Sequence, residues 1–118
     1  MSTQDIGQRG EDIAVNFLIS QGYRIRDRNL RLGRDEIDII AFDPVDKVIA
    51  FVEVKTLRRR DADYHPSLNY NWKKKCNTLR AARKWVIEER WGGGYRVDLL
   101  CVVGQRVVEH VKEVNFGY

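Results

Sequence analysis

The chain has few cysteines, and their spacing matches no metal-binding or disulfide pattern. Among its 118 residues, Cys76 and Cys101 stand apart, without a C-x-x-C pair or a Cys/His spacing. Zinc ribbons and disulfide-stabilised secreted domains need several cysteines at close or regular spacing. Neither class fits this sequence, and we predict two free thiols.

Long apolar runs and targeting signals are also lacking. No apolar stretch approaches the roughly 20 residues that a membrane helix needs. The opening MSTQDIGQRGEDIA has no basic-then-apolar pattern of a secretory signal. The chain has no internal repeat, low-complexity stretch or linker. We therefore expect a single domain over residues 1–118, located in the cytoplasm and without membrane contact.

Charge is abundant but unevenly distributed. Charged residues make up 32% of the chain, whose net charge is +4. Residues 55–84, here called the basic sector, hold ten Lys and Arg but only two Asp, a net +8 that leaves −4 on the remainder. Such a sector on a near-neutral body is typical of a protein that binds a polyanion. A solvated face that keeps the protein soluble gives the same pattern.

Hydrophobic periodicity predicts two helices and five strands. Apolar residues at helical spacing indicate helices over 4–20, closed by Gly22, and over 71–90, stopped by the glycines at 92–94. Alternating or continuous apolar runs indicate strands over 23–32, 36–42, 48–57, 95–103 and 107–116, with 58–70 as a loop. The predicted class is α/β, a five-stranded mixed sheet flanked by helices in the order α-β-β-β-α-β-β.

Two charges interrupt the apolar strand FVEVKTL, residues 51–57. Residues two apart in a strand share a face, so Glu53 and Lys55 point the same way. By the same rule Glu36, Asp38 and Ile40 share a face of the preceding strand. A hairpin between the two strands brings three acids and a lysine toward one cluster. Burying charges is costly unless they are paired or hold a metal.

A bound cation is one explanation for such a cluster. Like charges packed closely raise one another's pKa unless a cation lies between them. Carboxylate oxygens suit Mg²⁺ or Mn²⁺, and the ligands of soft metals are missing. Such an ion can activate water and polarise a phosphoryl oxygen, while Lys55 orients that water or stabilises charge on the phosphate. The alternative is an exposed hairpin whose charges form ordinary cross-strand salt bridges.

Motifs along almost the whole chain resemble those of the YraN-like family, an uncharacterised family within the PD-(D/E)xK nuclease superfamily. The superfamily resemblance rests on D-x14-E-V-K on a hairpin after a first helix. The family motifs are G-x-x-G-E-x-x-A-x-x-x-L-x-x-x-G-Y at 7–23, R-N-x-R at 28–31, E-I-D-x-I at 36–40, F-V-E-V-K at 51–55, R-x-D at 96–98, and His and Phe at 110 and 116. Two positions depart: Asp35 replaces a usual Gly, and Leu57 separates E-V-K from Arg58, so that the Arg comes one place late.

The resemblance implies a restriction-endonuclease-like core and roles for particular residues. Asp38 and Glu53 would be metal ligands, and Lys55 the catalytic lysine. Glu11 corresponds to a first-helix acid that often completes the metal shell in such nucleases. Its position three residues before Ala14 puts it at the edge of the helix's buried stripe. A helix-capping or surface role is the alternative for Glu11.

Other polar residues have less specific roles. Glu36 either supports the metal ligands or forms a salt bridge with Arg31 or Arg34. Phosphate contacts are expected from basic residues that follow the catalytic strand or open the second helix. These are Arg58, Arg59, Arg60, Lys73, Lys74 and Lys75.

Several residues are more simply explained by structure than by chemistry. Arg96 and Asp98 are expected to form a structural pair near a strand start, and we interpret His110 as structural. The three tryptophans can stack on bases, although packing in the core or on a helix is the simpler use. They are Trp72, Trp85 and Trp91.

The sequence therefore favours a divalent-metal-dependent nuclease that hydrolyses phosphodiester bonds of DNA. Related resolvases suggest branched or damaged DNA in repair or recombination, by fold analogy alone. The main alternative is a non-catalytic nucleic-acid-binding module that keeps the nuclease fold. A weaker one is a scaffold whose basic face binds an acidic protein. A homodimer is compatible with each of these functions.

Overall fold

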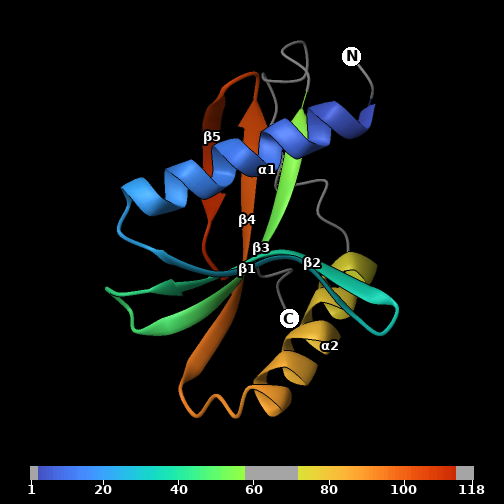
Figure 1. Cartoon of the computed structure of the whole chain (residues 1–118), viewed down its shortest axis with the longest axis vertical. Helices are drawn as coiled ribbons and strands as arrows, with labels where there is room; N and C mark the ends of the chain where they lie inside the picture. The colour runs from blue at the N-terminus through green and yellow to red at the C-terminus, as the bar shows by residue number, and fades with distance from the viewer. Residues whose placement is uncertain (1–2, 58–71, 114–118) are drawn as a thin grey trace.

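The chain folds into an α/β structure with one helix on each face of a mixed sheet (Figure 1). The computed structural model describes residues 3–57 and 72–113, with side chains for residues 8–57 and 76–113. The predicted loop at 58–70 lies outside these residues. The elements are α1 Thr3–Ser20, β1 Arg24–Leu32, β2 Asp35–Asp43, β3 Val48–Leu57, α2 Trp72–Glu88, β4 Gly94–Val103 and β5 Arg106–Val111. Of the helices described, neither has the length and hydropathy to cross a membrane.

The five strands follow one another across the sheet, in the order β1-β2-β3-β4-β5. β2 and β3 form the predicted antiparallel hairpin, in which Ile39 lies opposite Val52. β3 and β4 run parallel over the whole length of β3, and the crossover between them contains α2. Parallel strands need a long connection of this kind, whereas the other three pairs are antiparallel. The predicted class and element order are therefore confirmed.

β3 contributes to two cores by strict alternation. Ala50 and Val52 are buried against α1, whereas Ile49 and Phe51 are buried against α2. Trp85 of α2 meets Phe51 edge to face, with the ring centroids 5.6 Å apart, so this tryptophan belongs to the core. Burying a side chain such as Phe51 stabilises the fold by about 1.5–3 kcal/mol.

Both helices end in a left-handed residue, but only one of these is a glycine. α1 is closed by Gly22 at φ 91°, as predicted. α2 is closed by Arg90 at φ 53°, and the amide of Trp91 bonds back to the Val86 carbonyl at 3.0 Å. This is a Schellman arrangement, usually built on glycine. The expectation that the glycines at 92–94 stop the helix is wrong, because the turn is completed before them.

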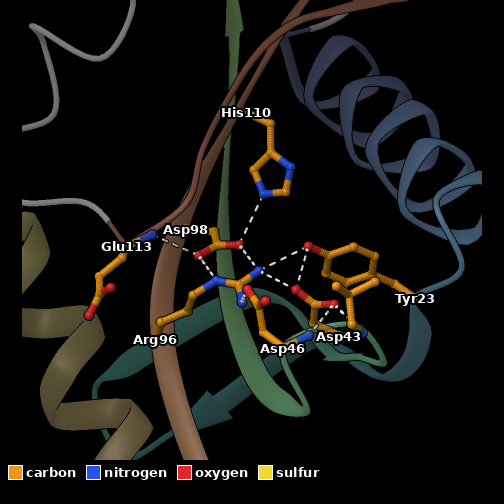
Figure 2. A network of polar contacts seen from close by, with 8 residues as sticks. Tyr23, Asp43, Asp46, Arg96, Asp98, His110 and Glu113 are labelled. Carbon is orange, nitrogen blue, oxygen red and sulfur yellow. Dashed lines mark hydrogen bonds and ion pairs between the residues drawn. The ribbon is translucent and has the colours of Figure 1, made fainter.

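A buried ionic network joins β2, β4, β5 and Tyr23, which lies between α1 and β1 (Figure 2). The Arg96 guanidinium contacts Asp98 at 2.8 Å and Asp43 at 2.9 Å. Tyr23 donates to Asp43 and accepts from Arg96, and His110 reaches Asp98 at 2.9 Å. The predicted structural pair of Arg96 and Asp98 is confirmed, and the contact of His110 agrees with its structural interpretation.

Both buried aspartates of this network are charged at neutral pH. Burial by itself would raise the pKa of Asp98, but hydrogen bonds from His110 and Arg96 outweigh it and lower that pKa. Burial also raises the pKa of Asp43, but hydrogen bonds from the Val45 amide and from Arg96 outweigh it and lower that pKa. Lowered folded-state pKa values stabilise the fold above the unfolded value of about 3.8. This stabilisation is lost as the pH falls through the folded values.

Arg96→Met should strongly destabilise the fold, because it leaves Asp98 and Asp43 buried without a counter-charge. Removing one partner of a buried ion pair costs about 3–5 kcal/mol, and urea denaturation at pH 7 should show a loss on that scale. The deficit should shrink in acid, first as the unpaired aspartates of the variant take up protons and then as the pH falls through the lowered pKa values of the wild-type network, below about 3.8. Arg96→Lys keeps the charge and should lose less. A loss below about 1 kcal/mol for Arg96→Met, typical of an exposed pair, would contradict this account.

Candidate active site

The regular alternation of side chains along β2 is broken at Asp38. Regular alternation would put Ile37 and Ile39 on one face, yet Ile39 packs against α1 whereas Ile37 packs against α2 together with Ile40. The pairing of β2 with β3 ends at Ile39, while its pairing with β1 continues to Asp35. From Asp35 to Asp38, before this pairing begins, the strand is not held by β3 and rotates about its axis. The prediction that Ile40 shares a face with Asp38 is therefore wrong.

Asp38 closes the gap that opens where β2 leaves β3. Its Oδ2 accepts a hydrogen bond from the backbone amide of Val54 at 2.9 Å. Val54 lies between Glu53 and Lys55, so the carboxylate takes the place of a backbone acceptor that β2 no longer offers there. The bond holds Asp38 against the backbone in the middle of the E-V-K stretch.

Glu53 and Lys55 project from β3 toward the α2 face, as the period of two predicts. Glu53 is 6% exposed, and its Oε1 lies 3.4 Å from the hydroxyl of Thr78 on α2. Lys55 is half-buried beside Cys101 of β4. Burial raises the pKa of the Cys101 thiol to about 12, an effect that the nearby Lys55 charge opposes. Cys76 and Cys101 are free thiols, as predicted.

Glu11 lies near Asp38, on the α1 side. One of its oxygens, Oε1, is buried and has no hydrogen-bond partner in the described part of the chain. Burial raises the pKa of Glu11, and the charge of Asp38 raises it further, because the two carboxylates repel each other. A hydrogen bond from Asn29 and the charge of Arg28 offset part of this effect. The capping or surface alternative does not account for the buried oxygen.

α1 approaches β3 closely next to Glu11. Gly10 is buried, and a Cβ at this position would collide with the hydroxyl of Thr56 on β3. Glycine therefore permits the close contact that carries Glu11 toward the end of the E-V-K strand. The family motif G-E at residues 10 and 11 thus has a packing reason and an electrostatic one.

Glu36 does not join a common cluster. It is exposed and pairs with Arg31 at 3.6 Å, one of the alternatives that the sequence left open. Its charge adds to the effects that raise the pKa of Glu11. Within residues 8–57 and 76–113, no group of three or more His, Cys, Asp or Glu could hold a metal ion. The expected convergence of three acids and Lys55 does not form, because the strand turns over at Asp38.

The donor chemistry nonetheless fits a hard divalent cation. Mg²⁺ usually keeps several waters and is held by one or two carboxylates together with substrate oxygens, so a cage of three protein acids is not required. Asp38 lies at the amide that links Glu53 to Val54, and Glu11 adds a buried oxygen without a donor. A buried acceptor without a partner calls for an explanation, and a cation would satisfy it.

The structure describes only part of the basic sector. Residues 58–60 and the side chains of Lys73, Lys74 and Lys75 lie outside the described set. Arg80 binds both oxygens of Asp35 at 2.8 Å, and Lys84 approaches the same carboxylate at 3.8 Å. These two cations hold α2 on the β1–β2 hairpin, so they are not part of a free phosphate-binding surface. Phosphate contacts by Arg58, Arg59, Arg60 and the three lysines stay a prediction.

Two polar residues near the site were not identified from the sequence. In the sequence, Asp35 stands out only as a departure from the family pattern. In the structure it is buried, and its hydrogen bonds from Arg80 lower its pKa. Arg80 and Lys84, four residues apart on one helix, were the available signal for an acidic partner. Thr78 had no such signal, because a threonine inside a helix is usually unremarkable.

Comparison with known sequences identifies the family. The model described as "Uncharacterised protein family UPF0102" matches residues 10–102. The chain belongs to this family. The match confirms the resemblance to the YraN-like family.

Similar UPF0102 proteins occur in distant bacteria. The protein of Lawsonia intracellularis is 34% identical over 97% of this chain and 87% of its own length. Those of Chlorobaculum parvum and Arthrobacter sp. are 42% and 41% identical, over 85% and 93% of this chain and 76% and 95% of their own. One solved structure, an EndoMS–dsDNA2 complex, covers 77% of this chain and 35% of its own, with 13% identity and a TM-score of 0.39. So low a score carries no argument about this UPF0102 protein, which spans about a third of that chain.

Glu11→Gln should stabilise the metal-free UPF0102 protein. The substitution keeps the shape of the side chain and removes a charge whose burial and proximity to Asp38 are unfavourable. At pH 7 without divalent ions, the midpoint of thermal unfolding should therefore rise above that of the wild-type protein.

The difference has a defined pH dependence. A raised folded-state pKa means that charged Glu11 costs stability above its unfolded pKa, near 4.5, and not below it. The gain from Glu11→Gln should therefore vanish when the pH falls below about 4. Glu88→Gln, the same substitution at an exposed glutamate in the last turn of α2, is the matched control. An unchanged or lower midpoint in Glu11→Gln would show that this carboxylate is stabilising.

Proposed function

We propose that this protein is a divalent-metal-dependent nuclease that hydrolyses phosphodiester bonds of DNA. The observation that carries the proposal is the hydrogen bond from the Val54 amide to Asp38. It places one carboxylate beside the backbone that links a buried Glu53 to a half-buried Lys55. A salt-bridged hairpin surface would not bury Glu53 or aim Asp38 at the strand edge.

Each residue has a distinct part in the proposed reaction. Asp38 and Glu53 would hold Mg²⁺ or Mn²⁺, and Glu11 would reach the ion through one of its bound waters, because among the described residues the three acids do not form a direct cage. When bound, such an ion polarises a phosphoryl oxygen and lowers the pKa of its water. Lys55, on the same face as Glu53, stabilises the charge that develops on the phosphate. The half-buried position of Lys55 makes this interaction stronger than it would be in bulk water.

The basic sector supports a polyanionic substrate. Its net charge of +8 would attract the DNA backbone, with residues 58–60 and 73–75 as the proposed contacts. Arg80 and Lys84 are excluded from this set, because they bind Asp35. Branched or damaged DNA is the substrate class that we propose, by analogy with related resolvases.

Asp38→Asn should abolish metal binding and cleavage while keeping the fold. The amide oxygen of Asn can still accept the bond from Val54, so the strand edge stays satisfied and only the charge is lost. Calorimetry with Mn²⁺ should give a binding isotherm for the wild-type protein and none for the variant. Cleavage of linear, flapped and four-way-junction DNA with Mg²⁺ or Mn²⁺ should fall by ~10²-fold or more.

A distant carboxylate serves as the control for this experiment. Glu88→Gln removes the same charge from an exposed position in the last turn of α2 and should leave both the isotherm and cleavage unchanged. A wild-type protein that binds DNA but neither binds Mn²⁺ nor cleaves any substrate would instead be a non-catalytic binding module. An unchanged Mn²⁺ isotherm in Asp38→Asn would remove this residue from the metal site.

Lys55→Met should separate catalysis from binding. Met keeps the apolar stem of the lysine and removes its charge, so packing beside Cys101 is maintained. One lysine among ten basic residues contributes little to DNA affinity, whereas loss of one preorganised contact lowers the rate by ~10²-fold or more.

Three measurements on the same sample test this prediction. Thermal stability, DNA affinity and Mn²⁺ affinity should stay near wild-type values while cleavage falls. Lys112→Met, at an exposed lysine after β5, should change none of them. Full activity in a folded Lys55→Met protein would exclude the catalytic role. A joint loss of stability and affinity would mean that Lys55 only balances the charge of Glu53.

A further inference from the structure

Thr78 is a buried polar side chain that faces the candidate site from α2. It is 2% exposed, and its hydroxyl donates to Oε1 of Glu53 at 3.4 Å. Burying a hydroxyl without a hydrogen bond costs about 1–3 kcal/mol. The contact is longer than the usual hydroxyl–carboxylate bond. Catalytic hydrogen bonds are often long before metal and substrate bind.

The position of Thr78 is set by a clamp two residues further along α2. Arg80 holds Asp35 with two parallel bonds of 2.8 Å, and Lys84 contacts the carbonyl oxygen of Leu32 at 3.5 Å. Paired guanidinium–carboxylate bonds fix orientation as well as distance. The clamp fixes the rotation of α2 about its axis, and that rotation decides which side chain meets Glu53.

We propose that Thr78 is a positioning residue, which orients Glu53 for the divalent cation. The inference rests on the proposed function and extends it from the ligands to the helix behind them. The hydrogen bond from Thr78 limits the rotation of the Glu53 carboxylate and so fixes the direction in which it meets a ligand. Hydrogen bonds of this kind to metal ligands are worth about 10- to 100-fold in metal affinity or activity. α2 thus serves the site through Thr78 and holds its own place through Arg80.

Thr78→Val tests the role of the hydroxyl. Val has nearly the same shape, so packing on the α2 face is kept while the donor is lost. Calorimetry should show Mn²⁺ affinity lowered by about 10-fold or more, with DNA affinity in EDTA unchanged. Thr78→Ser restores the hydroxyl and should recover wild-type Mn²⁺ affinity even though it loses a methyl group. That recovery is a result which a purely packing role for Thr78 would not give.

Two further variants complete the experiment. Ser20→Ala removes a hydroxyl from an exposed position at the end of α1 and should leave Mn²⁺ affinity unchanged. If Thr78→Val does not fold, Thr78→Ala replaces it, because the comparison with Thr78→Ser still isolates the hydroxyl. Weak Mn²⁺ binding by Thr78→Ala with normal binding by Thr78→Ser then supports the inference.

The outcomes distinguish this inference from the proposed function. Equal Mn²⁺ affinity in wild type, Thr78→Val and Thr78→Ser would overturn the positioning role and leave the nuclease proposal intact. Absence of Mn²⁺ binding by the wild-type protein would overturn both. Equal losses in Thr78→Val and Thr78→Ser would assign the effect to packing and would also overturn the positioning role.

Discussion

The hydrogen bond between the Val54 amide and the Asp38 carboxylate is the contact on which the candidate site depends. β2 pairs with both β1 and β3 from Ile39 to Asp43, but only with β1 from Asp35 to Asp38. Where a strand loses its neighbour inside a fold, its backbone amides lose their hydrogen-bond acceptors, which costs about 1–3 kcal/mol for each buried amide. Asp38 supplies an acceptor for the amide of Val54. The same bond places a carboxylate at the backbone between Glu53 and Lys55. One side chain thus serves the sheet and the proposed chemistry.

The acids of the Arg96 network and Glu11 differ in how their buried oxygens are satisfied, and the difference separates stability from function. Asp98 and Asp43 meet Arg96 directly, and their pKa values are lowered. Glu11 has a buried oxygen without a partner in the described residues, and its pKa is raised by burial and by Asp38. Burying such a carboxylate without a partner costs stability. The unfavourable charge lies where a cation would make it favourable.

Local pattern predicted most of the fold, because each element carries its own period. The strand predicted at 48–57 has those bounds in the structure. Its alternation puts Ile49 and Phe51 on the α2 face and Ala50 and Val52 on the α1 face. The pattern failed where the backbone departs from regular geometry. Arg90 adopts the left-handed conformation that glycine usually takes, and β2 rotates at a position that reads as regular strand.

By itself, the sequence determined the element order, the hairpin, the shared face of Glu53 and Lys55, and the family, since these depend on neighbours in the chain or on motifs. Only the tertiary structure decided which distant side chains meet. Glu11 lies near Asp38 because Gly10 lets α1 approach β3, and Thr78 faces Glu53 because Arg80 clamps Asp35. These contacts follow from the twist of the sheet and the rotation of α2. Both are set by the packing of the whole core, which no local period encodes.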